Sequence, residues 1–334
     1  MTQPTIKDIA KKLNISPSTV SRALNDHPDI SAETKRLVEM TSKELNYFPN
    51  TIAQSLKTKR STTIGVIVPE IKHDFFSSAI SGIEKVAYQS GYTIMVCQSN
   101  ESYEREVINT KALASQRIAG LVISISQNTV NGNHFKALQK RGMPIVFFDR
   151  VCDDVDASKV VINDEESAYK AVNHLIERGY TKIAHITGPL NLKICKDREE
   201  GYKKALREHS LFEDKDFIIS SGLHEENGYQ SMEALFNLGK IPDAIFAVND
   251  PVAIGAFKKI KEYGLKIPDD IAIVGFSNNP ITSLVEPPIT TVNQPSFGMG
   301  QRAAELLIKQ IESDAEFKPV TEVLKTTLIV RGSS

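Results

Sequence analysis

The residues best suited to chemistry lie near the N-terminus, between Ser16 and Arg22. Ser16 precedes Pro17, a pair that predicts a helix start because a hydroxyl can cap free amides and proline needs no N–H at the first helical position. Ser18 and Arg22 would face away from the apolar side of this helix, which holds Val20. Serine hydroxyls can bind phosphate, and arginine can donate two parallel hydrogen bonds to guanine. The segment therefore indicates contact with DNA.

Three helical patterns position this segment within the first 46 residues. Apolar side chains at helical spacing predict one helix over 5–13, a second from Pro17, and a third from Ser31 to about Asn46 with Leu37 on its buried face. Two short helices joined by a tight turn, with a third against them, form a helix-turn-helix unit. The second helix of such a unit enters the DNA major groove.

The distribution of charge favours a polyanionic partner for this head. Residues 1–60 carry ten Lys and Arg against six Asp and Glu, a net charge of +4. The remaining 274 residues carry 30 against 35, a net charge of −5, so the total is −1. A basic head on a mildly acidic body is typical of a nucleic-acid-binding region, and a solvated surface on a small domain is the alternative.

Composition indicates a soluble, two-domain protein of a reducing compartment, the cytoplasm. The chain has 334 residues, of which 41% are hydrophobic and 24% charged. Cys97, Cys152 and Cys195 are odd in number and widely spaced, which argues against a disulfide framework and a cysteine-rich zinc site. Apolar runs such as 64–68 are far shorter than the about 18 residues of a membrane span, and 1–14 lacks the apolar core of a signal peptide.

From residue 62 onward, apolar strand patterns alternate with amphipathic helical patterns. Near-continuous apolar strands separated by helices indicate parallel sheets that are covered on both faces. Two similar series of these patterns suggest a duplication. The expected strands are 64–68, 93–97, 120–125, 145–148, 160–162, 182–187, 217–220, 244–248 and 271–276.

The string TIKDIAKKLNISPSTVSRALN at 5–25 resembles the DNA-binding head of the LacI/GalR family of bacterial transcriptional repressors, as does ISAETKRLVEMTSKELNYFPNTIAQSLKTKRSTTIGVIVPEI after it. The resemblance covers essentially the whole chain. It implies an all-α helix-turn-helix head followed by an α/β body, whose two doubly wound parallel-sheet lobes form the type I periplasmic-binding-protein fold. The implied domains are a DNA-binding head at 1–48, a hinge helix and linker at 49–61, and an effector-binding and dimerisation domain at 62–334.

The resemblance also assigns DNA-contacting positions. Hydroxyl groups at Ser16, Thr19 and Ser21 would contact phosphates, whereas Ser18 and Arg22 would read base edges. In the hinge helix, Leu56 would wedge between base pairs in the minor groove; packing of this leucine on the body is the alternative. The full implied set is Thr5, Ser16, Pro17, Ser18, Thr19, Ser21, Arg22, Asn25, Tyr47, Asn50, Ala53, Leu56 and Lys57.

The resemblance places an effector between lobe one, at about 62–162 and 293–320, and lobe two, at about 163–292 and 321–334. Ligands of such sheets bind at the carboxyl ends of the strands. Many family members have Asp after a Gly-Phe pair where this chain has Ser277, a change that alters the usual sugar anchor. Both phenylalanines are expected on a loop after the first strand, and Arg198 is expected to contact either the ligand or a salt-bridge partner in the other lobe. The implied effector residues are Phe75, Phe76, Asp149, Arg198, Asn249, Ser277 and Gln294.

The resulting prediction is a cytoplasmic, homodimeric regulator, a repressor of a near-palindromic operator, whose small effector is a carbohydrate or derivative. Induction and co-repression both fit the sequence. A ligand-binding module of sugar transport is the alternative, and it leaves the basic head unexplained. No enzyme, metal or cofactor is expected, since GxSxG, P-loop and HExxH patterns are lacking. The stretch 298–303 (GMGQRA) is interpreted as helix packing and 224–226 (HEE) as a solvated helix start.

Overall fold

The computed structural model describes residues 4–47, 61–313 and 317–334. The chain divides into two units, 1–61 and 62–334, each with its own core. In the described part of the chain, no helix combines the length and the apolar character needed to cross a membrane.

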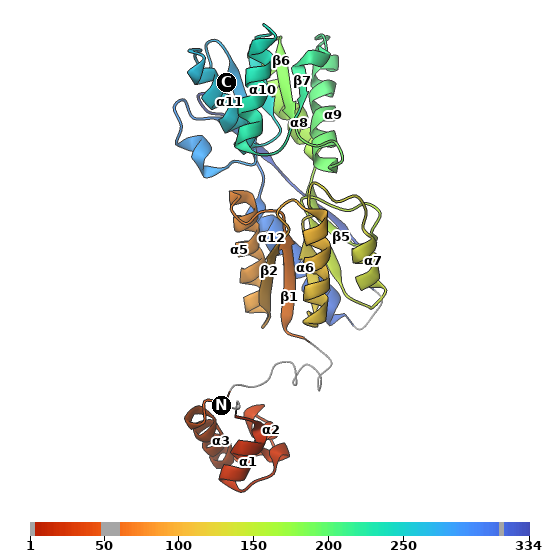
Figure 1. Ribbon diagram of the computed structural model, residues 1–334, viewed down its shortest axis with the longest axis vertical. Helices are drawn as coiled ribbons and strands as arrows, with labels where there is room; N and C mark the ends of the chain where they lie inside the picture. The colour runs from red at the N-terminus through yellow and green to blue at the C-terminus, as the bar shows by residue number, and fades with distance from the viewer. Residues whose placement is uncertain (1–3, 48–60, 314–316) are drawn as a thin grey trace. The chain divides into compact units, whose positions relative to one another are not determined.

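The first unit is a bundle of short helices (Figure 1), and the residues expected to start its second helix do so. At the start of the second helix, the Ser16 Oγ accepts a hydrogen bond from the Thr19 N–H at 3.1 Å. Ile9, Val20 and Val38 are fully buried where the helices meet. The helices are α1 (Ile6–Leu13), α2 (Pro17–Leu24) and α3 (Ala32–Glu44).

The burial of Leu37 on α3 is a wrong prediction, because its side chain is 43% exposed. The neighbouring Val38 is completely buried. A helix of thirteen residues that packs on two shorter ones has room for only a narrow apolar stripe. The core-facing stripe therefore passes through Val38 and Thr41 and leaves Leu37 at its edge.

Lobe one of the second unit is a parallel sheet between two helical layers. One sheet face, with Val66 and Val122, packs against α5 and α12, and the other, with Ile67 and Leu121, packs against α6 and α7. The strand order is β11-β5-β4-β3-β1-β2. Its elements are β1 (Thr63–Val68), α5 (Asp74–Gln89), β2 (Thr93–Gln98), α6 (Tyr103–Ser115), β3 (Gly120–Ile123), α7 (Asn133–Gln139), β4 (Ile145–Phe148), β5 (Ser158–Ile162), α12 (Ser296–Glu312) and β11 (Thr321–Leu324).

Lobe two repeats this plan, with α8 and α9 on one face of its sheet and α10 and α11 on the other. The strand order is β12-β10-β9-β8-β6-β7, and only β12 among these described strands runs antiparallel to its neighbour. Its elements are α8 (Asp164–Glu177), β6 (Ile183–Thr187), α9 (Lys193–Glu208), the 3-10 turn η1 (Lys215–Phe217), β7 (Ile218–Ser220), α10 (Glu225–Asn237), β8 (Ala244–Ala247), α11 (Asp250–Glu262), β9 (Ala272–Phe276), η2 (Pro280–Ser283), β10 (Thr290–Asn293) and β12 (Thr327–Ile329).

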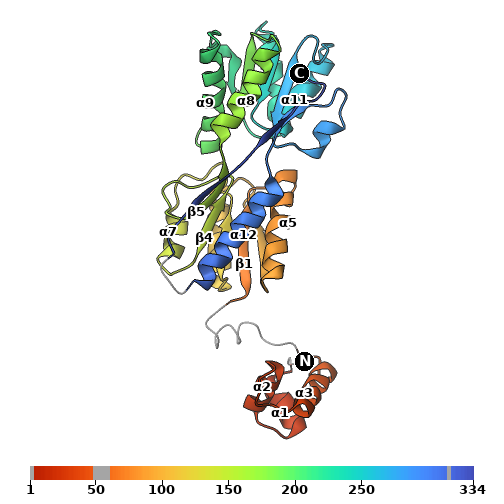
Figure 2. The same ribbon diagram turned by 180° about the vertical axis from the view of Figure 1, so that it is seen from behind.

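The chain passes between the lobes at 163, at 294–295 and at 325–326, where consecutive elements belong to different sheets. The lobe boundary expected at residue 320 is wrong, because β11 pairs in parallel with β5 of lobe one. Its alternating half-buried residues suit the edge of that sheet, and the chain reaches lobe two only at β12. Figure 2 shows this last stretch running diagonally between the lobes.

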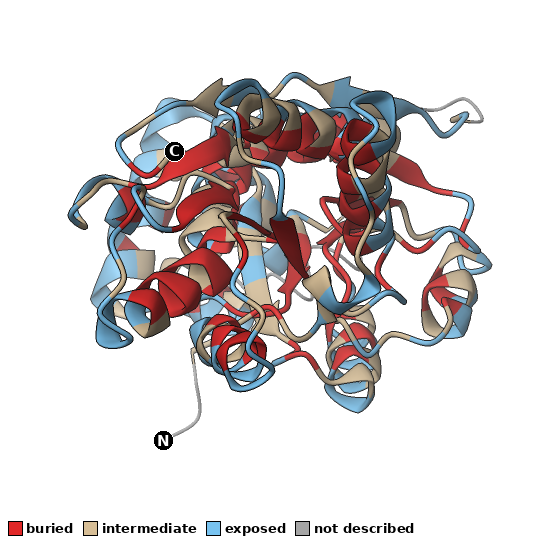
Figure 3. Cartoon of the chain, turned by 90° about the horizontal axis from the view of Figure 1, so that it is seen from above, coloured by how far each residue is buried: buried red, intermediate tan, exposed pale blue. Residues whose placement is uncertain are grey.

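Close helix packing accounts for Gly300 within the stretch 298–303, whereas Gly298 has no such close neighbour. A Cβ added at Gly300 would lie 2.0 Å from the backbone oxygen of Ala79 on α5, and one added at Gly82 would lie 2.1 Å from the backbone oxygen of Phe297. Glycine therefore lets α5 and α12 touch backbone to backbone (Figure 2). The buried residues in Figure 3 lie on the strands and on the inward faces of such helices.

Candidate DNA-binding face and ligand cleft

The start of α2 presents a cluster of hydroxyl groups to solvent. The Ser16 Oγ lies 2.7 Å from the Ser18 Oγ and 2.8 Å from the Thr19 Oγ1. One turn further on, Arg22 is exposed, and its guanidinium has no hydrogen bond or ion pair with the described residues. Asn25 closes the helix by donating to the Ser21 carbonyl at 2.7 Å. Hydroxyls and an unpaired guanidinium thus share one accessible face.

The other predicted DNA-contacting residues fall into two groups. Thr5 is the N-cap residue of α1, where its N–H and hydroxyl donate to the Asp8 carboxylate at 2.8 and 2.7 Å. The partly buried Tyr47 packs against the core of the head. The predictions for Asn50, Ala53, Leu56 and Lys57 lie outside the described residues.

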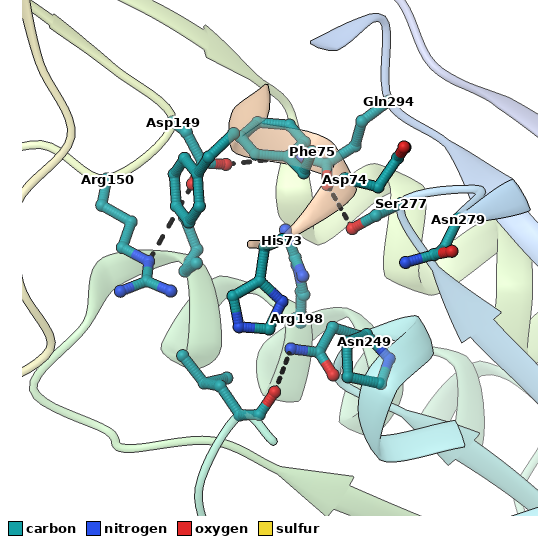
Figure 4. A pocket seen from close by; sticks show the side chains of 14 residues that line it. His73, Asp74, Phe75, Asp149, Arg150, Arg198, Asn249, Ser277, Asn279 and Gln294 are labelled. Atoms are coloured by element: carbon teal, nitrogen blue, oxygen red, sulfur yellow. Dashed lines mark hydrogen bonds and ion pairs between the residues drawn. The ribbon is translucent and has the colours of Figure 1, made fainter. Parts of the chain in front are cut away.

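A cleft between the two lobes holds all seven predicted effector residues. The space between its walls amounts to about 610 Å³, a figure that includes volume open to solvent. Figure 4 shows polar side chains from both lobes pointing into it. The lining residues are His73, Asp74, Phe75, Phe76, Asp149, Arg150, Ile194, Arg198, Leu223, Asn249, Pro251, Ser277, Asn279 and Gln294.

Asp149 and Arg150 form the charged wall of lobe one, directly after β4. Asp149 adopts a left-handed backbone conformation with φ of 59° and is 7% exposed. Burial raises the pKa of its carboxyl, although Arg150 and Arg198 oppose this effect. Arg150 donates to both Glu101 carboxylate oxygens at 2.8 and 3.0 Å, while its buried Nε has no hydrogen-bond partner among the described residues. The Nε lies 4.0 Å from the Asp149 Oδ2, so the two residues form an ion pair within the same wall.

Arg198 on α9 is held on the opposite wall by lobe two. Its Nε donates to the Asp164 Oδ1 at 2.8 Å, and its Nη1 donates to the Val248 carbonyl at 2.6 Å. Its guanidinium also lies 3.7 Å from the centre of the Phe276 ring. Because Asp164 belongs to the same lobe, this ion pair positions Arg198 at the cleft rather than linking the lobes.

Gln294 connects the two walls through its side-chain amide. The Ser277 Oγ of lobe two donates to the Gln294 Oε1 at 2.7 Å, and the Gln294 Nε2 approaches the Asp149 Oδ1 of lobe one at 3.4 Å (Figure 4). Gln294 itself stands where the chain crosses between the lobes. A ligand group that replaced either of these hydrogen bonds would therefore break a contact that joins the two lobes.

Three of the predicted residues have local roles within the protein. Phe75 and Phe76 lie in the first turn of α5 rather than in a loop, with Phe76 buried and Phe75 half-buried, and their rings meet edge to face at 5.2 Å. The Asn249 side chain caps α11 by accepting from the Val252 N–H at 2.9 Å, and it donates to the Leu223 carbonyl at the same distance. Its amide is thereby committed to the protein.

The set of seven omits other lining residues that the structure adds to the cleft. Arg150 and His73 could have been found, since each stands beside a predicted residue or loop at the carboxyl end of a strand. Asn279 carries no such signal, because it reaches the cleft only through the turn after β9, where its N–H donates to Asp250 at 2.6 Å.

Comparison with known proteins gives consistent matches along the chain. Residues 5–50 match the family described as bacterial regulatory proteins, lacI family, and residues 172–334 match the periplasmic binding protein-like domain. The HTH-type transcriptional repressor PurR of Aliivibrio salmonicida is 33% identical over 320 residues, which are 96% of each chain. The chain belongs to the lacI family of bacterial regulatory proteins. The resemblance seen in the sequence is thus confirmed.

Solved structures of the lacI family confirm the fold class as well. The lac repressor dimer bound to operator and the anti-inducer ONPF has a TM-score of 0.87 and 28% identity, over 99% of both chains. The CelR–cellobiose complex has a TM-score of 0.75 and 27% identity, over 99% of this chain and 100% of that one. A lacI-family regulator from Enterococcus faecium with bound ribose has a TM-score of 0.72 and 29% identity, over 81% and 98%. Like these relatives, the chain is a DNA-binding regulator with an effector domain.

Proposed function

We propose that this lacI-family repressor binds a near-palindromic operator as a homodimer, and that a carbohydrate or carbohydrate derivative in the cleft controls its operator affinity. The observation that carries the proposal is the Gln294 bridge. A ligand with several hydroxyl groups can replace the bonds of Gln294 to Ser277 and to Asp149, because each hydroxyl both donates and accepts. Such a ligand would change how the lobes are held together.

The chemistry of the cleft supports a polyhydroxylated ligand. Asp149 supplies an acceptor, the Nε of Arg150 supplies a donor, and Arg198 retains N–H groups beyond those bonded to the protein. The half-buried Phe75 offers an aromatic surface to the apolar face of a sugar. The sugars in the CelR–cellobiose and Enterococcus faecium ribose structures support the same class.

The DNA-binding part of the proposal assigns a head to 1–48, a hinge to 49–61 and an effector domain to 62–334. Two heads related by two-fold symmetry would read two half-sites, with Ser18 and Arg22 at the base edges. The segment 50–56 is too short for a stable isolated helix, so we expect it to order as a pair over the minor groove with Leu56 inserted.

Calorimetry with a ligand panel tests the effector assignment. Pentoses, hexoses and disaccharides form the carbohydrate arm, and nucleobases form a planar, non-carbohydrate arm. We expect a sugar to bind wild type and Gln294→Met to bind it at least tenfold more weakly. Gln230→Met, at an exposed position of α10 where Gln230 bonds Glu226, is the control and should match wild type. Binding of nucleobases alone, or equal affinity in all three proteins, would contradict the proposal.

A further inference from the structure

A second constellation of side chains lies at the edge of the cleft and plays no part in the proposal above. Glu70 follows β1 and His73 precedes α5, both in lobe one, whereas His224 precedes α10 in lobe two. One ligand atom from each side chain lies within 4.8 Å of the other two. The cluster therefore brings together two imidazoles and a carboxylate from both lobes.

Glu70 is the centre of this cluster and is only 6% exposed. Its Oε2 lies 2.7 Å from the His73 Nε2 and 3.4 Å from the His224 Nε2. No well-aligned hydrogen bond reaches this oxygen from the described residues, although both imidazole nitrogens lie within ion-pair distance of it. A buried carboxylate is costly unless it is paired, so this oxygen needs either a protonated imidazole or an external cation beside it.

Nearby protein cations do not fill that position. Lys72 lies 3.6 Å from the other oxygen, Oε1, and its side chain is 70% exposed. Arg150 is engaged with Glu101. The position facing both imidazoles and the Oε2 is therefore open to an external cation.

Two imidazole nitrogens and one carboxylate oxygen are the ligands of a borderline-soft divalent ion such as Zn²⁺, whereas Mg²⁺ and Ca²⁺ prefer oxygen ligands alone. With metal–ligand distances of about 2.0–2.1 Å, ligands of a tetrahedral site lie roughly 3.3 Å apart. The separation of 3.4 Å between Glu70 and His224 matches this value. The separation of 2.7 Å between Glu70 and His73 needs a small rotation of a side chain.

We propose that Glu70, His73 and His224 bind a divalent transition-metal ion of the zinc class and thereby fasten lobe two to lobe one. Only His224 reaches the site from lobe two, so the ion would favour the arrangement in which this residue approaches Glu70. His73 also lines the cleft, so the proposed ion would lie beside the ligand space. This site stands independently of the effector class.

The test is a zinc titration of the full-length protein after treatment with a chelator. His224→Asn removes one ligand but keeps a residue well suited to cap α10. Glu70→Gln removes the charge and keeps the shape, so two variants probe the two lobes. His209→Asn, at the end of α9 where His209 contacts Asn173, is the matched control.

We expect wild type and His209→Asn to bind one Zn²⁺ per chain and to gain thermal stability from it. His224→Asn and Glu70→Gln should bind at least tenfold more weakly and gain little stability. Co²⁺ should give the visible absorption of a four-coordinate site in wild type and not in the two variants. Equal zinc binding by all four proteins would show adventitious surface binding and overturn the proposal, as would the absence of zinc binding by wild type.

Discussion

The buried ion pair between Arg198 and Asp164 permits a quantitative prediction. Arg198 is 3% exposed and Asp164 is 6% exposed, and the arginine also bonds the Val248 carbonyl. Arg198→Met keeps much of the side-chain volume but leaves the carboxylate without its cation. Removing one partner of a buried ion pair costs about 3–5 kcal/mol. We therefore expect the free energy of unfolding to fall by about 3–5 kcal/mol at pH 7.5.

The pH dependence of this loss follows from the carboxyl group that remains. Burial raises the pKa of Asp164 to about 6 even though Arg198 opposes the shift. Without Arg198 the pKa rises further, so folded Arg198→Met takes up a proton more readily than its unfolded chain does. The folded variant gains stability relative to wild type as the pH falls from 7.5 to 5.5, because its buried charge is neutralised.

Urea denaturation of wild type, Arg198→Met, Asp164→Asn and the double variant, followed by circular dichroism at both pH values, measures these quantities. The double variant should lose less stability than the two single losses combined, because it leaves no unpaired buried charge. A loss below about 1 kcal/mol for Arg198→Met, a deficit equal at both pH values, or additive losses would refute the reasoning.

Three further predictions concern the packing, the core and the hinge. In thermal melts, Gly300→Val should destabilise the protein by several kcal/mol, because the new side chain would meet the Ala79 backbone oxygen. The control Gly298→Ala should be neutral, since the nearest atom to its added Cβ lies at 3.8 Å. Burial lowers the pKa of His185 to about 4, so this imidazole takes up a proton at higher pH in the unfolded chain than in the folded protein. The free energy of unfolding should therefore fall by about 3 kcal/mol as the pH falls from 6.5 to 4. In urea denaturation, His185→Leu should show a correspondingly weaker dependence of stability on pH. Leu56→Ala should weaken operator binding and leave binding to random DNA nearly unchanged in gel-shift titrations, and equal losses on both would contradict the wedge.

Features with local causes could be predicted from the sequence. The Ser16-Pro17 start of α2 and the alternation of strands and helices each depend on neighbouring residues. The glycines at 298–303 indicate close helix packing, but not that α5 is the partner. The cleft residues follow from the family resemblance, and all seven line the cleft. Their contacts with a ligand and with DNA stay predictions.

Features that depend on pairing between distant segments could not be predicted. The pattern of β11 does not show whether it joins the sheet of lobe one or lobe two, because an edge strand alternates in the same way in either. His224 read alone is a solvated helix start, and its approach to Glu70 depends on how the two lobes meet.

The central claim, sequence-specific operator recognition by α2, is tested most directly with Arg22→Ala in full-length protein. An operator selected from random double-stranded DNA and a random duplex are titrated with wild type, Arg22→Ala and the control Arg36→Ala, which removes an exposed positive charge from α3. We expect Arg22→Ala to lose about 1–3 kcal/mol, about 5- to 150-fold, on the operator and to relax specificity at one base pair. Its binding to the random duplex should fall no more than that of Arg36→Ala. Equal losses for the two variants on both DNAs would contradict base recognition by Arg22.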